Sequence, residues 1–205
     1  VTPTLIVVPM SFSDSQYLEF PPETWSTRWY DNYFGSSEWM QATRTSFKAA
    51  FLTMLVATPI GVLAAYGLHC SKVRFIRAAF VLMITPMMVP VVLVAIGAFY
   101  AYVQLKILYT MTGLVLAHTV LALPLVVIVT GSALKSYDMS QEKAARSLGA
   151  PRWKAFLTVT LPQIRFAVVT SALLAFLTSF DEVVVAMFVS GGDNPTLTRN
   201  MFNAL

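Results

Sequence analysis

Four long apolar segments constrain the fold of this chain more than any other feature of the sequence. They cover residues 46–68, 78–103, 111–134 and 164–190. Each is close to the roughly 20 apolar residues that a helix needs in order to cross a lipid bilayer. The sequence therefore predicts an all-α fold, a polytopic transmembrane helical bundle formed by one domain over residues 1–205.

Composition supports this prediction and excludes several classes of soluble protein. The chain is 57% hydrophobic and 12% charged, with a mean hydropathy of +0.67, whereas about a quarter of the residues in soluble domains are charged. A single core cannot hide this much apolar surface, so lipid must cover the rest. The lone Cys70 excludes a disulfide framework and a cysteine zinc site. The net charge of +4 is interpreted as a topology signal, not a nucleic-acid site.

The first apolar run, Leu5 to Met10, is too short to span and has no recognisable signal-peptide features. Residues 1–10 are therefore expected to be the end of a first span whose beginning is absent. The end of the chain, at residues 203–205, carries no cap or stop signal. Together with the four long segments, this indicates a fragment with about five of six spans visible. Prolines within the spans, at positions 59, 86, 90 and 124, are expected to mark kinks.

Lysine and arginine placement predicts the orientation, because cytoplasmic loops are enriched in both. The connections 69–77 and 135–165 carry Lys72, Arg74 and Arg77, and Lys135, Lys143, Arg146, Arg152, Lys154 and Arg165. Segment 11–45 instead has Arg28 and Arg44 against Asp14, Glu19, Glu23, Asp31 and Glu38. The two basic connections are expected in the cytoplasm. Segment 11–45, the turn 104–110 and the tail 191–205 are expected in the periplasm.

Residues 135–163 are predicted to form a helical hairpin outside the membrane. Asp138 or Ser140 can cap a first helix, and Ala144, Ala145 and Leu148 would give that helix a small apolar face. Gly149 stands where a left-handed residue ends such a helix. Pro151 suits the first turn of a second helix, and Pro162 the first turn of the next span. A hairpin of this size in a loop that could be much shorter indicates that a partner binds it.

The hairpin resembles a known family. Ala144-Ala145, Gly149, Val159 and Leu161-Pro162 have the spacing of the "EAA" loop of binding-protein-dependent, type I ABC importer permeases. The family's glutamate slot holds Lys143, with Glu142 one position earlier. Outside the loop, short motifs resemble the spermidine/putrescine permeases: Trp29-Tyr30, Phe34, Trp39, Ala42 and Ser46, then Ser179-Phe180-Asp181-Glu182 and Gly191-Gly192.

This resemblance implies an inner-membrane permease subunit that forms half of a solute pathway, with polyamines as the solute. In the family, the loop docks on an ATPase subunit and transmits its closure. The residues expected to couple to the ATPase are Glu142, Lys143, Ala144, Ala145, Leu148, Gly149, Ala150, Pro151, Arg152, Trp153, Leu161 and Pro162. The implied partners are ATPase subunits, a second homologous permease and a periplasmic solute-binding protein. ATP and Mg are expected on the ATPase, with no cofactor on this chain.

Asp181 and Glu182 are the only acids within the predicted spans. A charge at mid-membrane costs about 2.5–3.5 kcal/mol on insertion scales and usually faces a cavity. Adjacent residues of a helix point about 100° apart, so only one of the two would face a given pathway. One interpretation is structural, an interhelical salt bridge or access to interfacial water. The other, favoured by the resemblance and with Asp181 preferred, is an acidic patch that attracts a cationic solute.

Other functions are weighed against this hypothesis. The sequence has no Gly-x-x-x-x-Gly-Lys-Ser/Thr motif, so no P-loop for ATP is expected on this chain, and no catalytic constellation is found. His118 is expected to be a packing residue, and a metal site is not expected. An ion-gradient-driven carrier would use intramembrane acids but would not need the hairpin. A membrane anchor or sensor, or an importer of an anion, a metal complex or an amino-acid derivative, stays an alternative.

Overall fold

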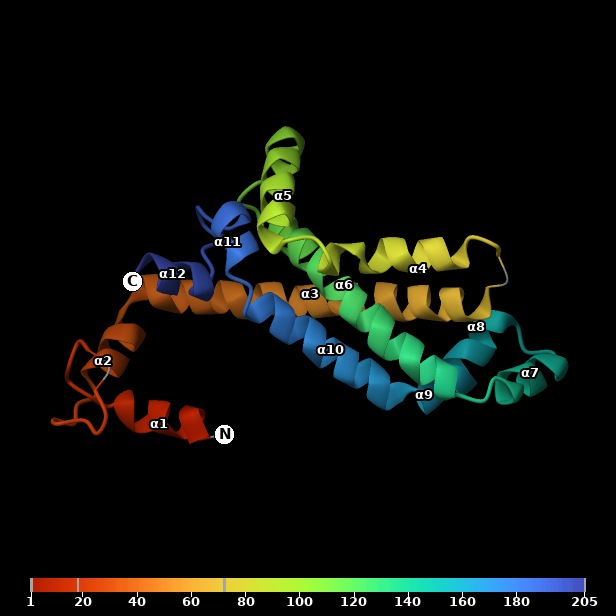
Figure 1. Cartoon of the computed structure of the whole chain (residues 1–205), viewed down its shortest axis with the longest axis horizontal. Coiled ribbons are helices and arrows are strands. Elements are labelled where there is room, and N and C mark those ends of the chain that lie inside the picture. Colours follow the sequence, from red (N-terminus) through yellow and green to blue (C-terminus); the bar gives the residue numbers. More distant parts are fainter. Residues whose placement is uncertain (1, 18, 72, 205) are drawn as a thin grey trace.

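The structure, a computed structural model, describes residues 2–17, 19–71 and 73–204, and for residues 2–4 only the course of the backbone. Figure 1 shows a bundle of helices, and the described residues contain no strand beyond two isolated bridges. The predicted all-α helical bundle is confirmed. The helices are α1 (Thr2–Met10), α2 (Arg28–Gly35), α3 (Ser37–Cys70), α4 (Ile76–Ile84), the 3₁₀ helix η1 (Thr85–Met87), α5 (Val91–Leu105), α6 (Met111–Ser136), α7 (Ser140–Ser147), α8 (Arg152–Ala155), the π-helix η2 (Phe156–Thr160), α9 (Leu161–Gln163), α10 (Arg165–Phe180), α11 (Val184–Val189) and α12 (Leu197–Asn203).

Two of the described helices are long and apolar enough by themselves to cross a membrane. They are α3, with 34 residues, and α6, with 26, and they contain the expected spans 46–68 and 111–134. Two further helix pairs pass the same test only together. Residues 76–87 and 91–105 meet at a bend of 94°, and residues 152–163 and 165–180 at a bend of 81°. The expected span 78–103 lies across the first bend, and the expected span 164–190 continues past α10 into α11.

The four prolines of the predicted spans differ in what they do to the helix. Pro59 and Pro124 lie inside α3 and α6, which continue through them. Pro86 and Pro90 stand on either side of the bend between α4 and α5. Pro90 caps the start of α5, a position where the missing backbone N–H of proline costs no helical hydrogen bond. The bend is therefore placed where two prolines occur close together.

Small residues bring the central helices α3, α6 and α10 close together. Figure 1 shows α6 passing across α3 and α10 running beside α6. Gly61 of α3 faces Val126 of α6 so closely that an added Cβ would lie 2.5 Å from Val126 Cγ1. Ala57 and Ala65, one turn away from Gly61 on each side, are also buried. In lipid, packing and not hydrophobic exclusion holds helices together, so close approach at small residues stabilises the bundle.

A second buried cluster joins α5, α11 and the beginning of α6. Ala95, Leu114, Val185 and Val189 form its centre. A hydrogen bond outside this cluster joins α12 to α3: the backbone N–H of Leu197 donates to Ser46 Oγ at 2.8 Å. The cluster and this bond together hold the residues after α10 beside α3.

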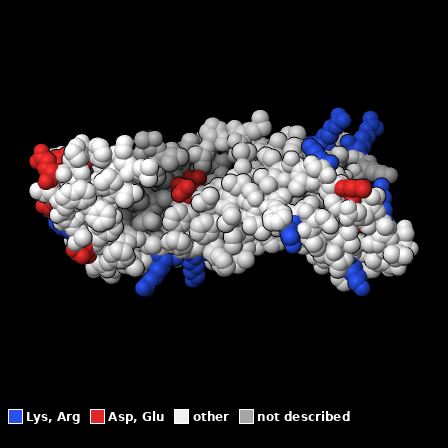
Figure 2. All heavy atoms as spheres, turned by 90° about the horizontal axis from the view of Figure 1, so that it is seen from below, with Lys and Arg blue, Asp and Glu red and all other residues white. Residues whose placement is uncertain are grey.

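Charge is distributed unevenly between the two ends of the long axis, the α2 end (α1 and α2) and the hairpin end (α7 and α8). Figure 2 shows most acidic atoms at the α2 end, with smaller acidic groups near the middle and at the hairpin end. Basic atoms lie mainly at the hairpin end, with a smaller basic group nearer the α2 end. Lys72, part of the basic connection 69–77, lies outside the described residues, as do Val1 and Leu205 of the expected end segments. The assignment of these two ends to the two sides of a membrane stays a prediction.

Candidate functional site

The hairpin end of the molecule is formed by α7, a short connection and α8. The connection has the geometry that ends a helix with a left-handed residue. Gly149 has φ +93°, its N–H bonds to Arg146 O at 3.0 Å, and the N–H of Ala150 bonds to Ala145 O at 3.2 Å. An added Cβ on Gly149 would meet nothing within 4 Å. Glycine is therefore favoured here by the backbone angle, and the surface around it is open.

Asp138 organises the beginning of α7. Its carboxylate accepts hydrogen bonds from the N–H of Ser140 at 2.9 Å and from the Ser140 hydroxyl at 2.6 Å. These bonds favour the ionised carboxylate, the hydroxyl bond most of all, and lower the pKa of Asp138. Of the two residues expected to cap the first helix, Asp138 thus makes the side-chain contacts. It stands two residues before α7 begins, and Met139 holds the N-cap position between them.

Glu142 is the buried residue of α7, with only 2% of its surface exposed. Its carboxylate accepts a hydrogen bond from the hydroxyl of Tyr66 at 2.6 Å and another from the hydroxyl of Thr160. Tyr66 lies near the end of α3, and Thr160 lies in the π-helix η2. Ala144 and Leu148, two of the three residues expected to form a small apolar face, are exposed on α7. The buried carboxylate of Glu142, with its two hydroxyl partners, fastens the helix to the rest of the molecule.

Tyr66 connects three elements at this place. Its ring packs on Phe156 with centroids 4.4 Å apart. The guanidinium of Arg152 lies 5.3 Å from the ring centroid, and Arg152 Nε donates to the Tyr66 hydroxyl at 3.4 Å. Tyr66 therefore holds both halves of the hairpin, α7 through Glu142 and α8 through Arg152, against the end of α3.

The π-helix η2, residues 156–160, continues directly from α8. Its wide turn is visible in the bond from the N–H of Leu161 to Phe156 O, a spacing of i to i+5. Such turns are rare and are frequently found at functional sites. Phe156 and Thr160, at the two ends of this turn, are both buried against the Tyr66–Glu142 contact. Leu161 and Pro162 follow as the first residues of α9, so Pro162 stands in a first helical turn.

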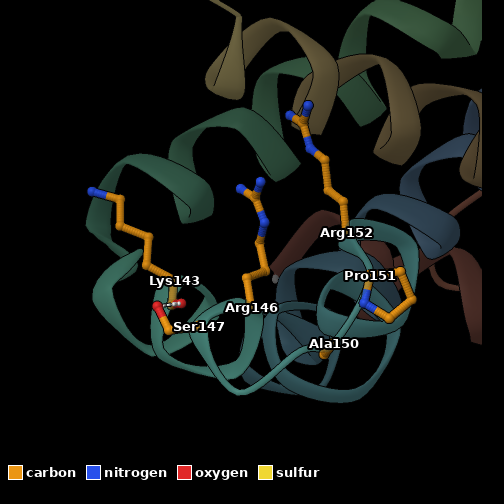
Figure 3. A pocket seen from close by; sticks show the side chains of 6 residues that line it. All are labelled: Lys143, Arg146, Ser147, Ala150, Pro151 and Arg152. Atoms are coloured by element: carbon orange, nitrogen blue, oxygen red, sulfur yellow. Dashed lines mark hydrogen bonds between the residues drawn. The ribbon is translucent and has the colours of Figure 1, made fainter.

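The tip of the hairpin exposes apolar side chains. Leu148 is 91% exposed and Trp153 is 67% exposed. Beside them lies an open cavity of about 450 Å³, lined by Lys143, Arg146, Ser147, Ala150, Pro151 and Arg152. Figure 3 shows the three cationic side chains extending from the hairpin toward the same side. Lys143, in the expected glutamate slot, is exposed. The hairpin therefore has an exposed apolar tip and a basic flank.

The structure brings none of these hairpin residues near Asp181 and Glu182, which lie beyond the other end of α10. Both acids stand at a break between α10 and α11, not on one helix as the sequence suggested. Glu182 Oε1 accepts from the N–H of Val185 at 3.0 Å and so caps α11. Asp181 is exposed, and among the described residues its carboxylate has no ion pair. The two acids therefore have different environments, and Asp181 is the one open to a solute.

A buried polar layer lies two residues before Asp181. His118 Nδ1 and Ser179 Oγ are 2.7 Å apart, and Ser179 Oγ donates to Thr53 Oγ1 at 3.3 Å. This layer links α6, α10 and α3 through the centre of the bundle. Among the described residues no cluster of three or more His, Cys, Asp or Glu side chains is suited to a metal ion. His118 is thus a hydrogen-bonded residue within the bundle.

Sequence reasoning missed Tyr66 and Thr160 as parts of the hairpin site. Tyr66 is separated from Glu142 by 76 positions, and an aromatic residue within an apolar segment is usually a packing residue. The one available signal was Glu142 itself. Glu142 is the one acidic residue of α7 and stands beside Lys143, and nothing in the local sequence shows which of these two neighbours is buried.

Comparison with known proteins identifies the family. Residues 57–204 match the family model described as "Binding-protein-dependent transport system inner membrane component". The chain is 31% identical over 202 residues to the spermidine/putrescine transport system permease protein PotC of Haemophilus influenzae, covering 98% of this chain and 78% of that protein. It is 34% identical over 214 residues to the putrescine transport system permease protein PotI of Escherichia coli K12, covering 99% and 74%.

A solved structure shows the same fold. A bacterial ABC transporter involved in the import of the acidic polysaccharide alginate superposes with a TM-score of 0.78 at 16% identity, covering 98% of this chain and 72% of that chain. The predicted membrane-permease fold is confirmed by this likeness, and the predicted family by the match of sequence. The chain belongs to the inner-membrane components of binding-protein-dependent transport systems, as a transmembrane permease subunit of an ABC importer.

Proposed function

We propose that this permease subunit imports polyamines across a bacterial inner membrane, driven by a separate ATPase that docks on the hairpin end. In this proposal the hairpin end faces the cytoplasm and the α2 end faces the periplasm. A second permease subunit completes the pathway, and a periplasmic binding protein delivers the solute. ATP and Mg belong to the ATPase, and this chain itself binds no cofactor.

The observation that carries the ATPase partner is the construction of the hairpin. Its tip exposes Leu148 and Trp153, which is costly in water unless a partner covers them. At its base, Glu142 and Arg152 both contact Tyr66 of α3. A push on the tip is therefore transmitted to a membrane helix through hydrogen bonds to Tyr66, the one from Glu142 buried, and not through a loose loop. The basic flank further favours an acidic docking groove on the partner.

The solute class has separate support. The two relatives above are named for spermidine and putrescine transport, and both solutes are cations. Asp181, exposed at the break between α10 and α11, provides a negative charge at the end of α10 that lies away from the hairpin. The alginate transporter has the same fold with an acidic solute, so the fold alone does not choose the solute. The acidic residue and the relatives together favour a polyamine.

Reconstitution of the assembled transporter in vesicles tests the proposal. We expect radiolabelled putrescine or spermidine uptake that requires the binding protein and ATP hydrolysis on the side of the hairpin. Uptake of the same solute without ATP, driven by an imposed ion gradient, would contradict the ATPase coupling. ATP-driven uptake of another solute with no polyamine uptake would contradict the solute class alone.

A further inference from the structure

A second recess lies at the neighbouring ends of α3, α4 and α6, away from the hairpin cavity. It is a groove of about 580 Å³ with a mostly apolar lining that includes Phe80 and Ile128. Three basic side chains, those of His69, Arg77 and Lys135, share the lining. None of its lining residues belongs to α7 or α8. The groove is therefore distinct from the surface proposed to dock the ATPase.

The three basic residues of this groove stand at one depth. His69 and Lys135 lie in the last turns of α3 and α6, and Arg77 is the second residue of α4. Ile128 precedes Lys135 by seven positions, which corresponds to about 10 Å along the axis of α6. The groove thus has a basic rim at the ends of the helices and an apolar floor farther into the bilayer. A phospholipid has the same order of charge and hydrocarbon.

The charges at the rim of the groove have no ion-pair partner in the part of the chain that the structure describes. Among the described residues, the one ion pair joins Arg28 to Asp14 at 3.4 Å, far along the chain from the groove. Arg77 and Lys135 are both exposed. Two cations beside an apolar floor, with no carboxylate against them, favour a ligand that supplies both a negative charge and an apolar chain.

Gly131 gives the groove its depth on the α6 side. An added Cβ there would meet nothing within 4 Å, so the missing side chain leaves open space in the lining. Gly67 of α3 is also in a helix and also has nothing within 4 Å of an added Cβ. It does not line the groove. This pair of glycines offers a way to fill the groove and a matched control that leaves it open.

We propose that this groove binds an anionic phospholipid, with the phosphate at Arg77, Lys135 and His69 and an acyl chain along Phe80 and Ile128. Basic pockets between membrane helices at the interface are suited to anionic headgroups. Charge complementarity at the rim selects the lipid over a purely apolar occupant. The proposal does not depend on polyamine transport or on the ATPase docking at the hairpin.

Photocrosslinking from Phe80 tests this site in the assembled full-length transporter. A benzophenone side chain replaces Phe80, and the protein is reconstituted in vesicles of equal parts phosphatidylglycerol and phosphatidylcholine. Mass spectrometry then identifies the adducts. We expect mainly phosphatidylglycerol adducts. Each of the single variants Arg77→Gln and Lys135→Gln should lower the ratio of phosphatidylglycerol to phosphatidylcholine adducts about fivefold. This factor corresponds to the roughly 1 kcal/mol with which one basic residue near a bilayer surface attracts an anionic lipid.

Two controls make the result specific to the groove. Lys154→Gln removes a basic residue of the hairpin that does not line the groove and should leave the adduct ratio unchanged. Gly131→Leu should lower the total yield of lipid adducts, whereas Gly67→Leu should not. Adducts to another protein chain, or an adduct ratio that does not change in the Arg77 and Lys135 variants, would overturn the proposal. The readout is a mass and not transport, so failure of the proposed function would leave this result intact.

Discussion

The hydroxyl of Tyr66 donates a 2.6 Å hydrogen bond to the buried carboxylate of Glu142, across a separation of 76 positions in the chain. Tyr66 belongs to a long membrane helix, and Glu142 belongs to the hairpin that lies outside the predicted spans. The bond therefore connects the two parts of the molecule that must move together if a partner at the hairpin is to act on a solute in the membrane.

Tyr66→Phe tests this connection while keeping the ring that packs on Phe156. A hydrogen bond to a charged group contributes about 1.5–3 kcal/mol, so we expect a clear fall in the thermal denaturation temperature of the purified transporter. Uptake per ATP hydrolysed should fall as well. Tyr100→Phe, which alters an exposed tyrosine, serves as the control and should change neither quantity. Equal effects of the two variants would show that the bond does not matter.

Substitution of Glu142 and of its neighbour Lys143 tests which of the two side chains fastens the hairpin to α3 and η2. Glu142→Ala leaves two buried hydroxyls without their acceptor, and unsatisfied buried groups cost about 1–3 kcal/mol. Lys143→Ala alters an exposed side chain and should change stability by less than about 0.5 kcal/mol. Limited proteolysis between α7 and α8 measures both effects. Faster cleavage of the Lys143 variant than of the Glu142 variant would contradict the structure.

Gly149→Asp should uncouple ATP hydrolysis from transport. A non-glycine residue at φ +93° carries backbone strain of about 1–3 kcal/mol, and the new side chain projects from the proposed docking face. We expect ATP hydrolysis to continue while uptake is lost or strongly reduced. Gly35→Asp, at another exposed glycine with open space around it, is the control. Normal uptake by the Gly149 variant would exclude the hairpin as the coupling element.

Gly61→Ala should destabilise the bundle itself. The added Cβ lies 2.5 Å from Val126 Cγ1 and 2.7 Å from Val126 Cβ, and overpacking of this kind costs about 1–3 kcal/mol. The double variant Gly61→Ala, Val126→Ala should recover much of the loss, because it removes the opposing side chain. Gly67→Ala, in the same helix with open space around it, is the comparison. Thermal denaturation of all three variants measures the effect, and a Gly61→Ala variant as stable as Gly67→Ala would contradict this packing.

Asp181→Asn should weaken the uptake of cationic solutes without disturbing assembly, because the exposed carboxylate has no ion pair among the described residues. Initial rates of putrescine uptake, measured at low and high salt, test this charge effect. Asp193→Asn removes another exposed acid of the same region and serves as the control. Unchanged uptake by the Asp181 variant, or an equal loss in both, would end the proposed role of Asp181.

The sequence by itself determined the features that depend on local composition. The lengths of the apolar segments predicted a helical membrane bundle, because the thickness of the bilayer sets the length of a span. Gly149 predicted the end of the first hairpin helix, since a left-handed helix end favours glycine wherever it occurs. The resemblance of the residues around it to the EAA loop predicted the family. These predictions required no knowledge of which helix lies beside which.

Only the tertiary structure decided which residues meet. The partners of Glu142 are Tyr66 and Thr160, and no pattern in the chain joins three residues so far apart. Packing also decided that Asp181 stands exposed at a break while Glu182 caps α11, where the sequence suggested one continuous helix. A buried carboxylate must find hydrogen-bond donors, but which donors it finds depends on how the helices pack, and that is a property of the whole bundle.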